Sequence, residues 1–216
     1  MTVIGVIGPI AAGKSVVMDE LSRLGAATIR ADEVSRELLR PGSDLLEEVI
    51  AEFGESFRRE DSGLDREKLG ILVFGDQDAR RRLERIVHPA MVRRIDAKIE
   101  QLRQADVSAV AVEAANLVEM GAGPLVDIVV MVSAPEEVRL RRLMSRDGLP
   151  RREAARRLAL HRRLGIEAHP ADFVIDSSGD EQTTRRQVQR LWRETVQQQE
   201  PPERGCDGSR AGVTQR

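Results

Sequence analysis

Eight residues near the start of the chain, GPIAAGKS at positions 8–15, have the composition and spacing of a phosphate-binding loop. Gly8 and Gly13 allow the backbone to curl so that its N–H groups point inward at an anion, facing the positive end of the next helix. Lys14 is placed to reach the β- and γ-phosphates of a nucleotide, and Ser15 to hold Mg²⁺. The loop between them would surround the phosphates with Pro9, Ile10, Ala11 and Ala12.

The residues on either side of this motif favour a phosphate loop over a chance match. TVIGVI at 2–7 is a continuous apolar run typical of a buried strand, and apolar residues then recur at Val17, Leu21 and Leu24 with helical spacing. The chain contains only three lysines, so a lysine at this position is unlikely to arise by composition alone. The alternative is an ordinary glycine loop that joins a strand to a helix and carries a surface lysine.

A carboxylate and a run of arginines are further candidates for phosphoryl chemistry. Asp32 follows a short predicted strand at 26–31, at the same sheet edge as the loop, where it could take a proton from an acceptor hydroxyl. Its alternative role is to cap the helix that begins there. Arg142 and Arg146 lie one helical turn apart beside a break at 148–150, and could bring positive charge to the transferring phosphoryl group. Most of the other arginines fit a solvated helix face.

Strands and helices alternate along most of the chain, which predicts an α/β fold with a parallel sheet flanked by helices on both faces. Ligands bind such sheets at the carboxyl ends of the strands. The segment 43–104 is helical with no strand, and an arginine-rich helical hairpin follows Pro135. Strands are predicted at 2–7, 26–31, 107–115, 127–133 and 171–179, with a closing helix at 180–199.

This pattern divides the chain into a core, an inserted helical domain, a lid and a tail. The predicted core comprises 1–42 and 106–197, and contains a lid at about 136–168. The inserted domain comprises 43–105. From 198 to 216 the chain has paired prolines, glycines and mixed charge without apolar periodicity, which predicts disorder.

Composition excludes several classes of partner for these 216 residues. Although 32% of the residues are charged, the net charge is only −2, which argues against a general nucleic-acid or membrane partner. The single cysteine, Cys206, rules out an intramolecular disulfide, and no apolar run reaches the ~18 residues that would span a bilayer. We therefore expect a soluble cytoplasmic protein.

A nucleotide site alone leaves open whether the protein is a kinase, a switch or a motor. The N-K-x-D sequence with which GTPases read guanine is absent, and a large motor would need a longer chain. A small kinase fits better, because it needs a lid to exclude water from the transferring phosphoryl group.

Six segments, in this order and spacing, resemble the dephospho-coenzyme A kinase family: VIGPIAAGKS, ADEVSRELLRPGS, HPAMV, LVE, RLMSRDG and ADFVIDSSG. The resemblance extends over roughly residues 2–195. It implies a P-loop NTPase core with a helical substrate domain inserted after the second βα unit, and a lid. It also implies transfer of a phosphoryl group from ATP, with Mg²⁺, to the ribose 3′-hydroxyl of dephospho-coenzyme A, the last step of coenzyme A synthesis.

The resemblance assigns roles to particular residues. Loop residues 8–15 match the family's ATP-binding loop, and Asp32 matches its catalytic base. Arg142 and Arg146 match lid arginines that approach ATP. His88 and Glu119 match positions near the acceptor, although His88 has a packed imidazole beside Pro89 as its alternative role, and Glu119 a surface carboxylate.

Several residues depart from the family's pattern. Arg30 replaces an aspartate two residues before the base, and Asn116 lies within a changed acceptor loop at 115–117. His161 replaces a glutamine after the lid, and Ser177 replaces an asparagine on the segment expected to touch adenine. These changes leave two alternatives open: a P-loop kinase with another acceptor, or a catalytically silent nucleotide-binding regulator. The sequence predicts ordinary surface roles for His161 and His169, and a core position for Trp192.

Overall fold

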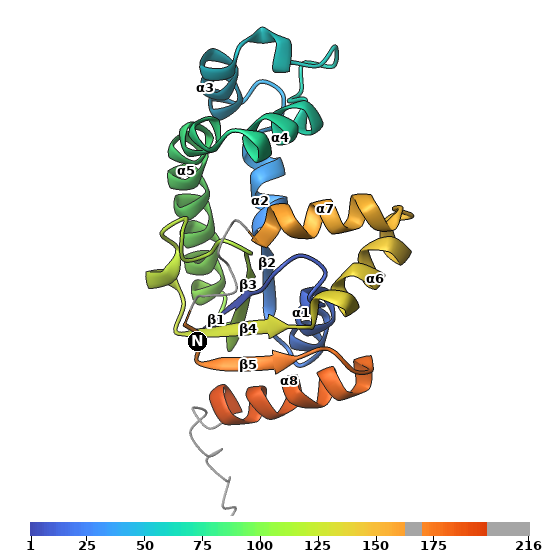
Figure 1. Cartoon of the computed structure of the whole chain (residues 1–216). Helices are drawn as coiled ribbons and strands as arrows, with labels where there is room; N and C mark the ends of the chain where they lie inside the picture. The colour runs from blue at the N-terminus through green and yellow to red at the C-terminus, as the bar shows by residue number, and fades with distance from the viewer. Residues whose placement is uncertain (163–169, 198–216) are drawn as a thin grey trace, which may run out of the picture.

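A parallel sheet forms the centre of the molecule in the computed structural model, which describes residues 1–162 and 170–197. Within these residues the sheet has five strands in the order β2-β3-β1-β4-β5, and every neighbouring pair is parallel (Figure 1). This confirms the predicted α/β class and places the apolar strands β1, β3 and β4 in the sheet interior. The strands are β1 Thr2–Ile7, β2 Ala27–Arg30, β3 Ala109–Glu113, β4 Ile128–Ser133 and β5 Phe173–Asp176.

Both faces of this sheet are covered by helices, which is why its central strands are largely apolar. On one face, Ile4 and Val6 pack in a cluster with α1 (Lys14–Arg23) and α8 (Glu181–Thr195). Trp192 on α8 belongs to the same cluster and is buried, as predicted. On the other face, Val3 and Ile7 pack with residues of α2 (Ala31–Leu38) and of α5 (Gln77–Gln104).

A group of helices stands beyond one end of this sheet and is drawn at the top of Figure 1. It comprises α3 (Asp44–Phe53), the short 3₁₀ helix η1 (Glu55–Phe57), α4 (Arg66–Gly75) and the first part of α5. Side chains of Ser43, Asp65 and Asp76 accept hydrogen bonds from the first turns of α3, α4 and α5, which fixes where these helices begin. Between 43 and 105 the only β pairing is an isolated bridge from Arg58 to Leu64, so the predicted helical character is confirmed.

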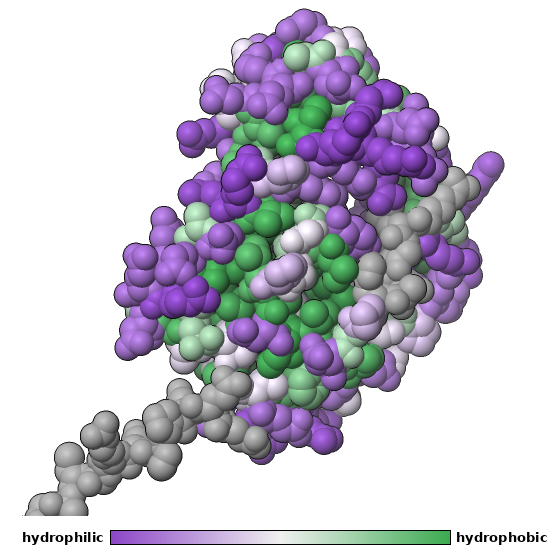
Figure 2. Space-filling model, turned by 90° about the vertical axis from the view of Figure 1, so that its left-hand side faces the viewer, coloured by the Kyte–Doolittle hydropathy of each residue, from purple (hydrophilic) through white to green (hydrophobic). Residues whose placement is uncertain are grey.

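α5 connects this helical group to the sheet. It is 28 residues long and contains Pro89, and its buried residues Met91, Ile95 and Ile99 follow helical spacing toward the sheet. Figure 2 shows the face on which α5 and the segment between β3 and β4 lie, and apolar side chains gather in its middle. That segment includes the short 3₁₀ helix η2 (Gly123–Leu125).

Two helices near the carboxyl ends of the strands form the predicted helical hairpin, which is called the lid below, although its action as a lid stays a prediction. α6 (Glu136–Asp147) ends at Gly148, which has a φ of 65°, and α7 (Arg151–Arg162) begins just after Pro150. Leu143 and Leu158 join the two helices in a small apolar cluster that also includes Ile10 and Ala11 of the phosphate loop. The lid is therefore packed directly against the loop. Predicted lid residues 163–168, His169 and the predicted tail at 198–216 lie outside the described residues.

One helix boundary differs from the prediction. β2 passes directly into α2, so Arg30 occupies the N-cap position and no side chain caps the helix. Asp32 already lies inside the first turn, where its carboxylate interacts favourably with the helix dipole but does not cap the helix. The prediction that Asp32 is the N-cap is wrong, because the strand leaves no loop residue in which a cap could form.

Across residues 1–162 and 170–197, none of the helices is both long enough and apolar enough to cross a bilayer.

A buried carboxylate joins the two helices on one face of the sheet. Glu20 on α1 is fully buried, and it accepts hydrogen bonds from Arg23, from Arg185 at 3.0 Å and from Gln189 at 2.6 Å, the last two on α8. The hydrogen bond from Arg23 is the largest cause that lowers the pKa of Glu20, to about 2. Ionised Glu20 therefore stabilises the packing of α8 on α1.

Replacing this carboxylate should destabilise the fold in a pH-dependent way. Glu20→Gln should lower the free energy of unfolding by about 1–3 kcal/mol at neutral pH, because a neutral amide pairs poorly with two guanidinium groups. Since folding depresses the pKa from 4.5 to about 2, the wild-type advantage is fully present above the unfolded pKa and is lost as the pH falls through the folded pKa. Urea unfolding of both proteins, from neutral pH down through the unfolded and folded pKa values of Glu20, measures this difference in the free energy of unfolding.

The matched control for this experiment is Glu194→Gln on α8. Glu194 pairs with Arg190 at 2.7 Å, but both side chains are exposed. We expect a change below about 0.5 kcal/mol for the control. Equal losses in the two variants would contradict the assignment to Glu20.

Candidate functional site

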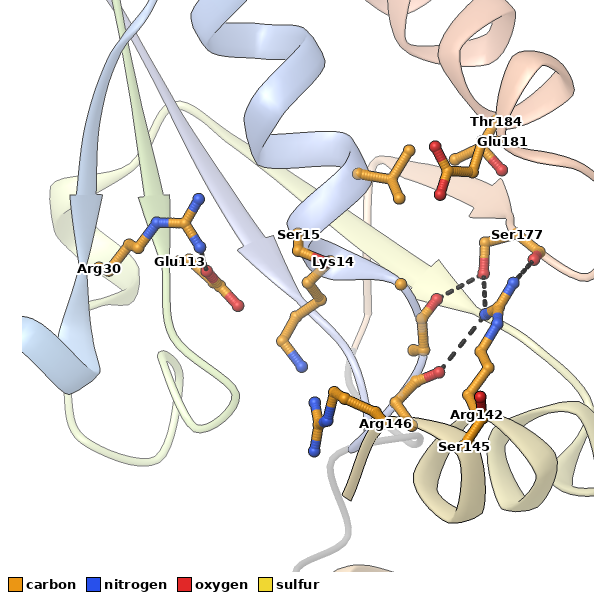
Figure 3. A pocket seen from close by; sticks show the side chains of 14 residues that line it. Lys14, Ser15, Arg30, Glu113, Arg142, Ser145, Arg146, Ser177, Glu181 and Thr184 are labelled. Carbon is orange, nitrogen blue, oxygen red and sulfur yellow. Dashed lines mark hydrogen bonds and ion pairs between the residues drawn. The ribbon is translucent and has the colours of Figure 1, made fainter. Parts of the chain in front are cut away.

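A pocket of about 520 Å³ opens beside the phosphate loop, at the carboxyl ends of the strands (Figure 3). The loop contributes residues 11–15 to its lining. The other lining residues that matter below come from five separate elements or their ends: Arg30, Glu113, Arg142, Arg146, Ser177, Glu181 and Thr184. This is the position at which an open parallel sheet binds its ligand.

The backbone of the loop has the curled conformation that its glycines predicted. Gly8 has a φ of 146° and Gly13 a φ of 91°, and Ala11 also adopts a positive φ, of 59°. A Cβ atom on Gly8 would lie 2.4 Å from the backbone oxygen of Val132 on β4, so no other residue fits without displacing backbone. Gly13 is followed directly by Lys14, the first residue of α1.

The ammonium of Lys14 lies across the loop. Its Nζ atom donates to the backbone oxygens of Gly8 at 2.9 Å and Pro9 at 3.1 Å. Burial lowers the pKa of Lys14, and the negative charges of Glu113 and Asp32 act in the opposite direction. The ammonium therefore lies in the field of two carboxylates. Glu113 is at the end of β3, and Asp32 is in the first turn of α2.

Arg142 and Ser177 brace the loop from the lid side. The Arg142 guanidinium donates to Ser177 Oγ at 3.1 Å, to the backbone oxygen of Ser177, and to the backbone oxygen of Ala11 at 3.4 Å. Ser177 is buried, and its hydroxyl donates to the backbone oxygen of Ala12. Figure 3 shows these contacts converging on the turn of the loop. Sequence reasoning placed both residues at the nucleotide, and both line the pocket.

Arg146 is oriented by its neighbour on α6. Its Nε atom donates to Asp147 Oδ1 at 2.7 Å, and this hydrogen bond raises the pKa of Arg146. The side chain lines the pocket one turn beyond Arg142, and its positive charge lowers the pKa of Lys14. The lid therefore brings a fixed cation to the same volume as the loop lysine.

The three residues predicted to face the acceptor lie outside the lining of this pocket. Asp32 is exposed on the first turn of α2, and its negative charge acts on Lys14. His88 on α5 is half-buried, and its Nε2 lies 3.3 Å from Nδ2 of Asn116 on the turn after β3. Burial lowers the pKa of His88, and the charges of Glu84 and of Glu119, exposed on the same turn, oppose that shift. His88 thus contacts Asn116, Glu119 lies on the same turn as Asn116, and these residues do not line the pocket.

His161 differs from the surface role that the sequence predicted. It is half-buried near the end of α7, and burial lowers its pKa to about 4, with the charge of Lys14 as the next cause. Its Nδ1 atom is buried and has no hydrogen-bond partner among the residues that the structure describes. The prediction failed because α7 folds back over the loop, which the sequence of the helix does not reveal.

Glu113 is a pocket residue that sequence reasoning missed. It is the last residue of β3, which lies beside β1 and therefore beside the phosphate loop. A signal was present, because VSAVAVEAA places one acidic residue at the end of an otherwise apolar strand. Glu181 and Thr184 on α8 were also missed, since nothing in that helix marks them in the sequence.

The oxygen donors of the pocket suit Mg²⁺ held together with phosphate. Within 1–162 and 170–197 no three His, Cys, Asp or Glu side chains are grouped as a metal site. Ser15 and Glu113 nevertheless line the same pocket, and both offer hard oxygen atoms. Mg²⁺ commonly binds through one or two protein oxygens, substrate phosphates and waters, so this donor set fits it.

Sequence comparison finds relatives along nearly the whole chain. The family profile described as "Dephospho-CoA kinase" matches residues 2–183. The dephospho-CoA kinase of Geobacter metallireducens is 43% identical over 197 residues, which cover 91% of this chain and 98% of that protein. The dephospho-CoA kinase of Geobacter sulfurreducens is 40% identical, with 89% and 98% covered.

Solved structures show the same similarity. A Thermus thermophilus protein superposes with a TM-score of 0.70 and 28% identity, over 89% of this chain and 97% of its own. Dephospho-CoA kinase from Campylobacter jejuni gives a TM-score of 0.65 and 26% identity, with 91% and 98% covered. Shikimate kinase from Acinetobacter baumannii, at a TM-score of 0.52, 16% identity and 93% and 96% coverage, shares the fold alone.

The contact of Gly8 with β4 makes a direct prediction. Gly8→Ala should weaken ATP binding at least tenfold, because the new methyl group must push the loop away from the Val132 carbonyl. Titration calorimetry with ATP measures the loss. Gly123→Ala is the control, because a Cβ atom at Gly123 would have no neighbouring atom within 4 Å. This variant should bind ATP normally. Unchanged binding by Gly8→Ala would show that the loop tolerates displacement.

Proposed function

This chain belongs to the dephospho-CoA kinase family, whose reaction is the last step of coenzyme A biosynthesis, and from that premise we propose how its residues carry out the transfer. The phosphoryl group passes from ATP to the ribose 3′-hydroxyl of dephospho-CoA. The observation that carries the proposal is the convergence, at one sheet edge, of the curled loop, Lys14 and two carboxylates.

The loop and the lid bind the triphosphate. The backbone of 8–13 and the amino end of α1 present N–H groups to the β-phosphate, and Lys14 exchanges its contacts with Gly8 and Pro9 for phosphate oxygens. Arg146 approaches the transferring group from α6, while Arg142 holds Ser177 and the loop in place. The lid excludes water, so that the acceptor hydroxyl is phosphorylated in preference to water.

Ser15 and Glu113 would hold Mg²⁺ beside the phosphates. When bound, the cation neutralises charge that develops on the β- and γ-phosphate oxygens. Ser15 supplies a hydroxyl oxygen from the first turn of α1, and Glu113 a carboxylate oxygen from the end of β3. These two side chains would be the protein ligands of the cation.

Asp32 is proposed as the base that takes the proton of the acceptor hydroxyl. It lies exposed at the start of α2, outside the lining of the nucleotide pocket. An in-line transfer needs the attacking oxygen on the side of the γ-phosphate opposite the leaving group. The effect of the Asp32 charge on Lys14 supports a position near the reacting phosphate.

The helical segment 43–105 is proposed to bind the rest of dephospho-CoA. α5 carries His88 from this segment to the turn after β3, where it meets Asn116, and Glu119 lies on the same turn. These three groups offer hydrogen-bond donors and acceptors to a polar acceptor. The predicted domain division and cytoplasmic location remain predictions, and the small-molecule substrate follows from the family.

The test of the function is ADP release from MgATP with and without dephospho-CoA, with the product identified by mass. We expect release that depends on the acceptor and an equal amount of coenzyme A. Tight ATP binding without any coenzyme A would overturn the proposed acceptor.

Removing the loop ammonium should abolish transfer. Lys14→Ala should lower kcat/KM by more than ~1,000-fold, because the ammonium proposed to contact the β- and γ-phosphate oxygens is lost. Lys98→Ala is the matched control: Lys98 on α5 pairs with Glu37 on α2 at 3.1 Å, outside the pocket lining, and should keep wild-type turnover. Turnover of Lys14→Ala within tenfold of wild type would contradict the phosphate assignment.

Neutralising the proposed base should slow the chemical step and spare nucleotide binding. Asp32→Asn should lower kcat by about 10²–10⁴-fold, the range for loss of general-base catalysis, with an ATP dissociation constant within twofold of wild type. Asp44→Asn, a change of another exposed first-turn aspartate, serves as control and should leave kcat unchanged. A near-normal kcat in Asp32→Asn would remove Asp32 from this role.

A further inference from the structure

Arg30 and Glu113 form an ion pair across the ends of two neighbouring strands. They are register partners on β2 and β3, and Arg30 Nη1 lies 3.2 Å from Glu113 Oε2. The second nitrogen, Nη2, lies 3.2 Å from Asp19 Oδ1 on α1. One guanidinium thus bridges a carboxylate of the sheet and a carboxylate of α1, the helix that follows the phosphate loop.

This pair belongs to the nucleotide pocket. Arg30 and Glu113 both line it together with Lys14 and Ser15, and Figure 3 shows the Arg30 guanidinium directed at Glu113. The side chains of Arg30 and Glu113 are 32% and 20% exposed, so the pair is partly shielded from water. The charge of Glu113 also opposes the lowering of the Lys14 pKa by burial. A single carboxylate therefore serves two cationic side chains.

A divalent cation at Glu113 would meet the charge of Arg30. The guanidinium already occupies one carboxylate oxygen, and its positive charge opposes a second cation nearby. Asp19 holds the other end of the guanidinium, so Arg30 does not leave freely. A lysine in its place could not reproduce both contacts, because Arg30 reaches Glu113 and Asp19 through two different nitrogen atoms of a planar guanidinium, whereas lysine has one.

We propose that Arg30 is a positioning residue that holds Glu113 and competes with the divalent cation for it, so that the cation binds firmly only when nucleotide phosphates share it. The inference rests on the proposed function in taking Glu113 as a cation ligand. It concerns a residue that never touches the reacting atoms. Its consequence is a site whose metal affinity is set by a protein cation.

The experiment measures how much Mg²⁺ is needed to tighten ATP binding, without any acceptor present. ATP affinity is determined by calorimetry in EDTA and at increasing free Mg²⁺. Arg30→Gln should lower the Mg²⁺ concentration for half-maximal tightening by about twofold to fivefold, the range expected for loss of one partly exposed ion pair. ATP affinity in EDTA should stay within twofold of wild type, because Arg30 acts on the cation site.

A double-mutant cycle with Glu113→Gln separates this role from direct phosphate binding. Glu113→Gln should raise the Mg²⁺ requirement, and in that background Arg30→Gln should change the requirement less than in wild type, because only the repulsion between the guanidinium and the cation is left to remove. If Arg30→Gln weakens ATP binding in EDTA, or lowers the Mg²⁺ requirement by the same factor in the Glu113→Gln background, then Arg30 does not act through Glu113 and the proposal is overturned. An unchanged Mg²⁺ requirement in Arg30→Gln overturns it as well.

Two further variants guard against a change in folding. Arg30→Lys keeps the charge but loses the two-nitrogen contact with Asp19 and Glu113. Its Mg²⁺ requirement should fall between those of wild type and Arg30→Gln. Arg58→Gln is the matched control, because Arg58 also bridges two carboxylates, Glu47 and Glu55, outside the pocket lining; it should bind MgATP as wild type does. A Mg²⁺ requirement that equals wild type in both Arg30 variants counts against the proposal.

The readout separates this inference from the proposed function. If the wild-type protein forms no coenzyme A but Arg30→Gln shifts the Mg²⁺ requirement, the proposed acceptor is rejected and the role of Arg30 is kept. If coenzyme A forms normally but Arg30→Gln causes no shift, the proposed function is kept and the role of Arg30 is rejected.

Discussion

The close approach of the phosphate loop to the end of β4 is the constraint on which the rest of the site depends. Gly8 has no room for a Cβ atom against the Val132 carbonyl, and a Cβ on Gly13 would lie 3.1 Å from the Ser177 hydroxyl and 3.3 Å from the Arg142 guanidinium, a close but softer contact. The loop is therefore held between the sheet and the lid. Because its backbone is fixed, its N–H groups, Lys14 and the start of α1 have a defined direction before any ligand binds.

Charge is arranged around this fixed loop in two opposing sets. Glu113 and Asp32 counter the desolvation of Lys14, while Arg146 brings a further positive charge from the lid. Arg30 adds a cation on the sheet side, where it is neutralised by Asp19 and Glu113. The pocket thus contains positive groups that can meet phosphates, together with carboxylates that keep those groups balanced in the free protein.

Much of this could be predicted from the sequence, because it depends on local patterns. The apolar runs of the central strands, the helical periodicity of α5 and the spacing of the phosphate loop are all readable over short windows. The cap at Asp32 was predicted wrongly, since β2 and α2 join without a loop. His161 was misjudged and Glu113 was overlooked, because their surroundings come from segments distant along the chain.

By itself, the sequence determined the α/β class, the phosphate loop with Lys14 and Ser15, and the family to which the chain belongs. The tertiary structure alone decided that Arg142 grips Ser177, that His88 meets Asn116 and that Arg30 pairs with Glu113. The physical reason is the same in each case. These partners are brought together by strand order and helix packing, and a contact between residues far apart in the chain leaves no periodic mark in either segment.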